Sequence, residues 1–236
     1  MITVSNIPKE WILTKGKGVK IGIIDSGCFI DHRNLNIKEY KTFGRTSENH
    51  GTHIAGIINS NANNYSIHGF CTESDIYFAG CDFTQQNNLV YLYNALDWMK
   101  QQKVDILNLS FALKNDHEKI KEVLKEMSKH TIICCAYSEN LRYPHSYDFT
   151  IDIDNKKRGT IYAEGKFIST SARNSFTELS GSSMATAFVV SVFGIAKSFN
   201  KNITINEIYR TINGKEPYHT SSTYFNKRIK QKIISL

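Results

Sequence analysis

Three polar side chains stand in sequence contexts that could support nucleophilic chemistry. Asp25 ends the apolar run GVKIGIID, His50 opens HGTHIAG, and Ser183 lies in GSSMATA at the head of a long apolar stretch. A serine hydroxyl is a weak nucleophile until an imidazole can take its proton, and the imidazole needs a carboxylate to fix its tautomer. A helix N-terminus can also stabilise developing negative charge. Brought together, the three side chains predict a catalytic triad in the order Asp25, His50, Ser183.

Each of these residues has a plainer interpretation when it is taken alone. Asp25 could be a turn residue, and the Ser183 hydroxyl could cap a buried helix. His50 and His53 could ligate a metal, but HGTHIAG lacks the glutamate of an HExxH site and no further ligands stand at suitable spacing. We therefore expect one basic imidazole near a helix start, close packing through Gly56, and neither a metal site nor a cofactor.

Alternating apolar strands and helices must position these groups. Four short apolar runs, at 19–25, 75–81, 104–110 and 131–136, are typical of buried parallel strands. Apolar residues at helical spacing follow the second run, and again after Asp116. This pattern predicts an α/β fold with a mostly parallel central sheet flanked by helices. Ligands bind beyond the carboxyl ends of such strands, which directs attention to Asp25, Ser110 and the residues after Ala136.

Length and composition indicate one globular domain spanning residues 1–236. The chain is 41% hydrophobic and 22% charged, and it has no run of about 18 apolar residues, so a membrane helix is not expected. We see neither a signal peptide nor room for a pro-domain before the first motif, and we expect a cytoplasmic protein. The five cysteines have no CxxC spacing and are interpreted as reduced core thiols.

The net charge of +7 comes in part from a basic C-terminal tail, about residues 218–236. Such a tail could touch nucleic acid, but no DNA-binding motif accompanies it. A solvated basic face is the favoured interpretation, so nucleic acid is an unlikely partner.

The three motifs IIDSG, HGTHIAG and GSSMATA, in this order, resemble the subtilisin-like serine proteases (subtilases, peptidase family S8). The resemblance extends over residues 18–193 and implies a three-layer subtilisin-like fold and endopeptidase activity on peptide or protein substrates. It further implies that Asp25 orients the base, His50 acts as general base and then general acid, and Ser183 is the nucleophile. His53 is implied to be structural.

Two departures from the family pattern concern the surroundings of the triad. The segment LSFAL resembles the substrate-binding strand, with Ser110, Phe111 and Ala112 where the family usually has Ser-x-Gly. The added side chains predict a narrower or reshaped P1 pocket. At the family's oxyanion asparagine the chain offers Glu139 or, with one inserted residue, Asn140. An amide can donate to an oxyanion whereas a carboxylate repels it, so we favour Asn140.

The sequence thus predicts an intracellular serine endopeptidase that makes limited cuts, for example in processing a peptide precursor. The altered oxyanion segment leaves one alternative, a catalytically impaired subtilase-like module that binds peptides without cutting them. The oligomeric state and the P1 preference are not predicted.

Overall fold

A computed structural model describes residues 1–61, 68–83 and 88–213 of the chain. The predicted basic tail at 218–236 therefore lies outside the described residues. The expectation of one domain over the whole length stays a prediction.

A seven-stranded sheet forms the middle layer, in the order β2-β3-β1-β4-β5-β6-β7. Its strands are β1 (Lys20–Asp25), β2 (Glu39–Phe43), β3 (Asp75–Cys81), β4 (Ile106–Leu109), β5 (Ile132–Ala136), β6 (Ile151–Asp154) and β7 (Ile161–Tyr162). All neighbouring pairs are parallel. The four strands predicted from apolar runs are the four central ones, β3, β1, β4 and β5. Their buried side chains face helices on both sides, which is why they read as continuous apolar segments.

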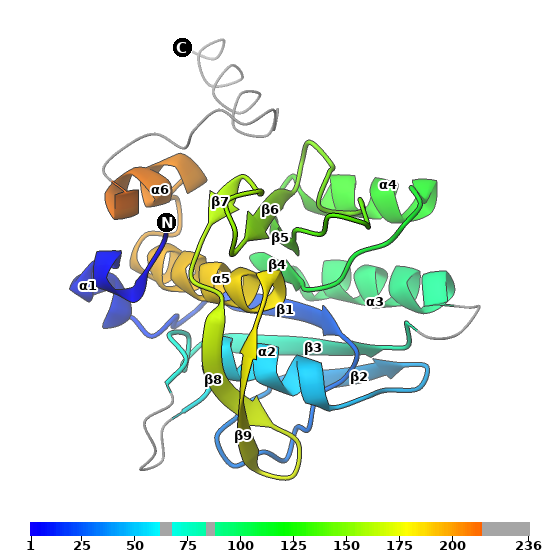
Figure 1. The fold of residues 1–236 in the computed structure, drawn as a ribbon, viewed down its shortest axis with the longest axis horizontal. Coiled ribbons are helices and arrows are strands. Elements are labelled where there is room, and N and C mark those ends of the chain that lie inside the picture. Colours follow the sequence, from blue (N-terminus) through cyan, green and yellow to red (C-terminus); the bar gives the residue numbers. More distant parts are fainter. Residues whose placement is uncertain (62–67, 84–87, 214–236) are drawn as a thin grey trace.

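Helices cover the two faces of the sheet and make a three-layer α/β architecture (Figure 1). On one face α2 (Asn49–Asn59) packs against α5 (Ser182–Phe199), and on the other α3 (Asn88–Gln102) packs against α4 (Glu118–Met127). The predicted fold class is confirmed. Near the ends of the chain, α1 (Lys9–Ile12) and α6 (Ile205–Asn213) contact α5. A short 3-10 helix, Val4–Asn6, precedes α1.

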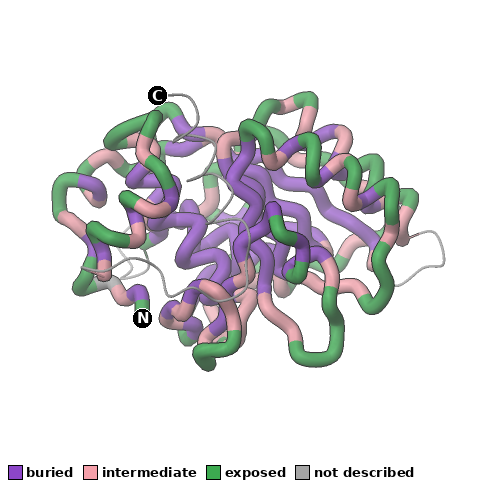
Figure 2. Tube along the Cα trace, turned by 90° about the horizontal axis from the view of Figure 1, so that it is seen from above, coloured by how far each residue is buried: buried purple, intermediate pink, exposed green. Residues whose placement is uncertain are grey.

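Helix α5 runs through the interior. Residues 184–196 are all buried, and Figure 2 shows this central helix and the sheet as the buried heart of the molecule. By length and composition α5 could cross a membrane, but 72% of it is buried inside the protein, as in the core helix of many soluble folds. A capping box precedes α6, because Thr204 and Glu207 exchange hydrogen bonds between backbone N–H and side chain.

An antiparallel hairpin, β8 (Lys166–Ser171) and β9 (Ser175–Ser180), leads directly into α5. Arg173 and Asn174 form its turn with positive φ angles of 56° each. Strand β8 packs against α2, and its Ser169 and Thr170 hydroxyls donate to carbonyl groups of that helix. The hairpin therefore links the helix that carries His50 to the helix that carries Ser183.

Candidate active site

Asp25 and His50 are brought into direct contact. Asp25 is the last residue of β1 and is 3% exposed, while His50 lies in the first turn of α2. The imidazole Nδ1 is 2.8 Å from Oδ1 and 3.0 Å from Oδ2 of Asp25. A carboxylate can only accept, so Nδ1 carries the proton and Nε2 keeps its lone pair. The N–H of Ser26 also donates to Asp25 Oδ1, at 2.7 Å, which helps to satisfy the buried carboxylate.

The electrostatics of this pair favour a basic imidazole. Burial opposes protonation of His50, but the hydrogen bond and the negative charge of Asp25 outweigh it and raise the pKa of His50 above the usual range of a histidine. The His50 side chain is 38% exposed, so its free nitrogen remains accessible from outside.

Ser183 lies at the amino end of α5, where Gly181 is the N-cap residue. Glycine has no side chain to cap the first-turn N–H groups, so these donors are available to an anion. The Ser183 hydroxyl donates to the carbonyl oxygen of Ser110 at 3.2 Å, and the Ser110 hydroxyl donates back to the Ser183 carbonyl at 3.2 Å. Within the described residues, no hydrogen bond joins Ser183 to His50.

The sheet register explains how the serine comes near the imidazole. Ile24 of β1 pairs with Leu109 of β4, so the residues that follow them, Asp25 and Ser110, lie side by side at the carboxyl ends of the two strands. Neighbouring strands lie about 5 Å apart. Ser183 is bound to Ser110, and α2 packs against α5. The carboxylate, the imidazole and the hydroxyl therefore gather at the carboxyl ends of two central strands.

Ser110, Phe111 and Ala112 continue beyond β4, and the Phe111 ring lies 4.6 Å from the ring of Phe83. The following residue, Leu113, forms an isolated antiparallel bridge with Tyr143. The bridge ties this segment to the loop after β5, so the two sequence-predicted regions border the same edge of the sheet.

The loop after β5 holds both oxyanion candidates. Glu139 is exposed, and its carboxylate forms an ion pair with Arg158. Arg158 also binds Asp154, whose side chain is completely buried. Asn140 is exposed and has no hydrogen-bond partner among the described residues. Ser138, which the sequence motifs do not single out, is a half-buried hydroxyl nearer to the end of β5 and accepts the N–H of Leu141 at 3.2 Å.

The second histidine of the motif, His53, is fully buried, and its Nε2 is 3.1 Å from the Thr177 carbonyl of β9. Burial lowers its pKa, so it is neutral and joins helix to hairpin. Within the described ranges, no group of three or more His, Cys, Asp or Glu side chains is arranged to hold a metal ion.

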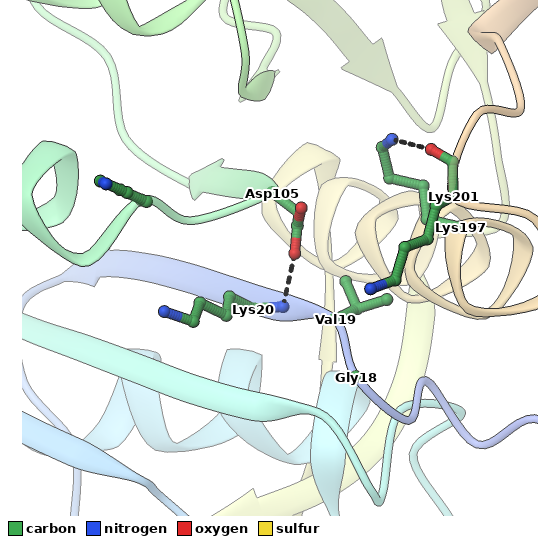
Figure 3. A pocket seen from close by; sticks show the side chains of 7 residues that line it. Gly18, Val19, Lys20, Asp105, Lys197 and Lys201 are labelled. Atoms are coloured by element: carbon green, nitrogen blue, oxygen red, sulfur yellow. Dashed lines mark hydrogen bonds between the residues drawn. The ribbon is translucent and has the colours of Figure 1, made fainter.

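A basic pocket of about 210 Å³ lies at the opposite, amino end of the sheet (Figure 3). Its lining includes Lys20, Lys103, Lys197 and Lys201, with Asp105 accepting the main-chain N–H of Lys20 at 2.8 Å. Strand β1 separates this pocket from Asp25 by roughly 16 Å, at about 3.3 Å per residue. The pocket is therefore distinct from the candidate site.

Comparison with known proteins identifies the family. The model of the subtilase family matches residues 16–153, which is more than half of the chain. The intracellular serine protease of Paenibacillus polymyxa is 25% identical, over 86% of this chain and 75% of its own length. The major intracellular serine protease of Bacillus subtilis (strain 168) is also 25% identical, over 85% of this chain and 75% of its own length. Subtilisin DY of Bacillus licheniformis is 22% identical, over 90% of this chain and 89% of its own length. The chain therefore belongs to the subtilase family and is a subtilisin-type serine endopeptidase.

Proposed function

We propose that this endopeptidase works through Asp25, His50 and Ser183. Ser183 Oγ attacks the scissile carbonyl while His50 Nε2 takes its proton, and the acyl-enzyme is then hydrolysed by water. Asp25 holds the imidazole and stabilises the imidazolium. The observation that carries the proposal is the bidentate contact of His50 Nδ1 with the buried Asp25 carboxylate.

The step that remains is a small reorientation of the nucleophile. In the free protein the Ser183 hydroxyl donates to Ser110, and rotation about its side-chain bond would turn it toward the imidazole. Catalytic hydrogen bonds are often long in the absence of substrate and tighten when it binds.

A fluorophosphonate probe tests the assignment, because it reacts only with an activated serine. We expect the wild type to be labelled, and we expect Ser183→Ala, correctly folded, to lose both labelling and peptide hydrolysis. Ser182→Ala is the matched control, since it removes the neighbouring hydroxyl of the same helix turn and should keep labelling. A folded wild type that is not labelled would instead support the peptide-binding module.

For the oxyanion we propose two donors, the N–H groups at the uncapped start of α5 and the amide of Asn140. The ion pair of Glu139 with Arg158 supports this choice, because it engages the competing carboxylate. Asn140→Ala should lower kcat by about 10²–10³, a range that comes from the corresponding donor of subtilisin itself. Ser138→Ala is measured beside it. A large loss in Ser138→Ala, with Asn140→Ala near wild type, would transfer the role to the serine hydroxyl.

We propose that Ser110, Phe111 and Ala112 border the P1 pocket and that Ala112 narrows it. Ala112→Gly should then admit larger P1 side chains, measured by sequencing the products of a peptide library. An unchanged P1 profile would show that Ala112 only packs beside the strand.

We further propose that the protein acts inside the cell on a limited set of peptides. The two relatives named as intracellular serine proteases support the location alone. Fractionation of the cells that make it, with the fluorophosphonate probe as the marker, tests the location. Recovery of the labelled protein only from the medium would overturn it.

A further inference from the structure

A buried amide lies directly beneath the Ser110–Ser183 contact. Asn108 is the one polar residue of β4, is 0% exposed, and is paired in the sheet with Ile23 and Cys134. Among the residues that the structure describes, its Oδ1 has no hydrogen-bond partner. A buried polar group without a partner destabilises the folded state, and an apolar side chain of the same shape would avoid that cost. The position of this amide therefore calls for a reason other than stability.

The Asn108 amide begins a chain of hydrogen bonds that ends at the nucleophile. Its Nδ2 donates to Ser110 Oγ at 3.0 Å, and Ser110 Oγ donates to the carbonyl oxygen of Ser183 at 3.2 Å. The NH₂ group can only donate, so it occupies a lone pair of the Ser110 hydroxyl. The proton of that hydroxyl is thereby left for the Ser183 carbonyl.

The contact between Ser110 and Ser183 holds the amino end of α5. The N-cap residue Gly181 has no side chain with which to hold the first turn, whereas Ser110 grips Ser183 at its carbonyl and accepts its hydroxyl. By the roles proposed above, Ser183 carries the nucleophilic Oγ and lies in the turn whose N–H groups would bind the oxyanion. A displacement of about 1 Å in such a group can cost about 100-fold in rate.

We propose that Asn108 is a positioning residue for the nucleophile, acting through the Ser110 hydroxyl. The inference rests on the proposed role of Ser183. Asn108 makes no contact with substrate; it sets the direction of one hydroxyl, and this hydroxyl fixes the turn from which Ser183 reacts.

The test replaces the amide by an apolar side chain of similar size. Asn108→Leu should lower kcat, and the rate of fluorophosphonate labelling, between about 10-fold and about 100-fold with KM little changed. The melting temperature of Asn108→Leu should not fall in proportion to this loss of kcat. Asn34→Leu is the matched control, because Asn34 is 2% exposed, donates through Nδ2 to the Asn61 carbonyl, and also has an Oδ1 without a partner among the described residues. This control should change the melting temperature but not kcat. If Leu is not accommodated, Asn108→Ala replaces it, with Asn34→Ala beside it.

A double-mutant cycle tests the route. If Asn108 acts through Ser110, the variant Asn108→Leu/Ser110→Ala should have the kcat of Ser110→Ala alone. Fully additive losses would overturn the proposal, as would a wild-type labelling rate in folded Asn108→Leu and Asn108→Ala. Failure of the wild type itself to label would instead contradict the proposed role of Ser183, so the two failures are distinguishable.

Discussion

At the scale of single residues, the pairing of His50 with Asp25 sets the pH range in which the proposed triad can act. The imidazole must be neutral to accept the serine proton. The hydrogen bond and charge of Asp25 raise its pKa although burial lowers it. The residue that stabilises the imidazolium in the reaction therefore also shifts the pH range of activity upward.

The acid limb of the profile of kcat/KM against pH should consequently have its midpoint above about 6.5, the ordinary histidine value. Activity should be lost as the pH falls through this midpoint, because His50 becomes protonated. In Asp25→Asn only the burial remains, so the midpoint should move below that of the wild type and kcat should fall roughly 10⁴-fold. An unmoved midpoint in Asp25→Asn would contradict this account. Asp31→Asn is the control, because Asp31 is an exposed carboxyl in the loop that follows β1.

Residue types and spacing were enough to predict that Asp25 and His50 come together at the carboxyl end of β1. They could not predict the orientation of Ser183 toward Ser110, because hydroxyl rotation depends on neighbours that are distant in sequence. Nor could they locate Asn108, which in ILNLS looks like an interruption of an apolar strand. Ser138 could not be found in this way, because the family motif has an amide at the oxyanion position and so points only to Glu139 and Asn140.

At the scale of elements, α2 can approach the end of β1 because of one glycine. A Cβ atom added at Gly51 would overlap the carbonyl oxygen of Gly27 and press on the Cβ atom of Asp25. The obstacle is backbone and cannot turn aside. The glycine next to His50 thus sets the distance between helix and strand.

Gly51→Ala should therefore push His50 away from Asp25 and lower kcat by about 100-fold, measured with a peptide substrate. Gly56→Ala, in the same helix, is the comparison. Its Cβ would collide with the Ser169 and Thr170 hydroxyls, which donate to carbonyl groups in the preceding turn of α2. We expect Gly56→Ala to lower the melting temperature mainly, with a smaller effect on kcat per folded molecule. Equal kcat values for the two variants would argue against a positional role of Gly51.

The loop after β5 is anchored by Arg158. This residue binds the completely buried Asp154 carboxylate as well as the exposed Glu139, and its guanidinium lies 5.2 Å from the centre of the Tyr137 ring. Burial raises the pKa of Asp154, but the hydrogen bonds and charge of Arg158 outweigh it and hold that pKa below its usual range. The ion pair with Arg158 compensates the buried charge of Asp154 at the base of the loop after β5, which carries the proposed oxyanion donor.

Arg158→Met should lower the free energy of unfolding by about 2–4 kcal/mol at neutral pH, because Asp154 is left buried without its partner. Glu139→Gln breaks only the exposed half of the network and should cost less than about 1 kcal/mol. Urea unfolding of both variants measures the difference. A loss in Glu139→Gln as large as in Arg158→Met would show that the exposed pair is the important one.

The sequence predicts the elements whose apolar periodicity is strong. It does not predict those that form only by pairing with segments distant in the chain. The four central strands and helices α3 to α5 follow from burial on one or two faces. Strand β2 has mostly exposed or half-buried residues, and β7 is two residues long, so neither carries an apolar run. The hairpin β8–β9 mixes polar and apolar residues without a continuous apolar run. Its strand β8 packs against α2, which is distant in sequence.

At the scale of the whole molecule, all five cysteines are free and buried, as predicted. Burial raises the pKa of Cys28 and of Cys81 to about 12, and it raises the pKa of the other three as well. The thiols therefore stay protonated and shielded in the native protein at neutral pH.

Iodoacetamide should leave the native enzyme fully active and unmodified, and it should alkylate all five cysteines after denaturation, as counted by mass spectrometry. The physical reason is that only an accessible thiolate reacts at an appreciable rate. Rapid modification of the native protein, with loss of hydrolysis, would show that one of these side chains opens to solvent. Cys28 would then be the first to examine, because its thiol lies near Asp25.

The helix that bears Ser183, the proposed nucleophile, is also the core of the fold, so the protein cannot unfold locally around this residue and keep the rest intact. A copy that unfolds loses its activity and at the same time becomes an extended chain, which is what an endopeptidase cuts. In a heated solution, molecules that are still folded would digest those that have unfolded. The rate of heat inactivation should therefore rise with the concentration of the enzyme. The Ser183→Ala protein, heated alone, should lose intact chain at a rate that does not depend on its concentration.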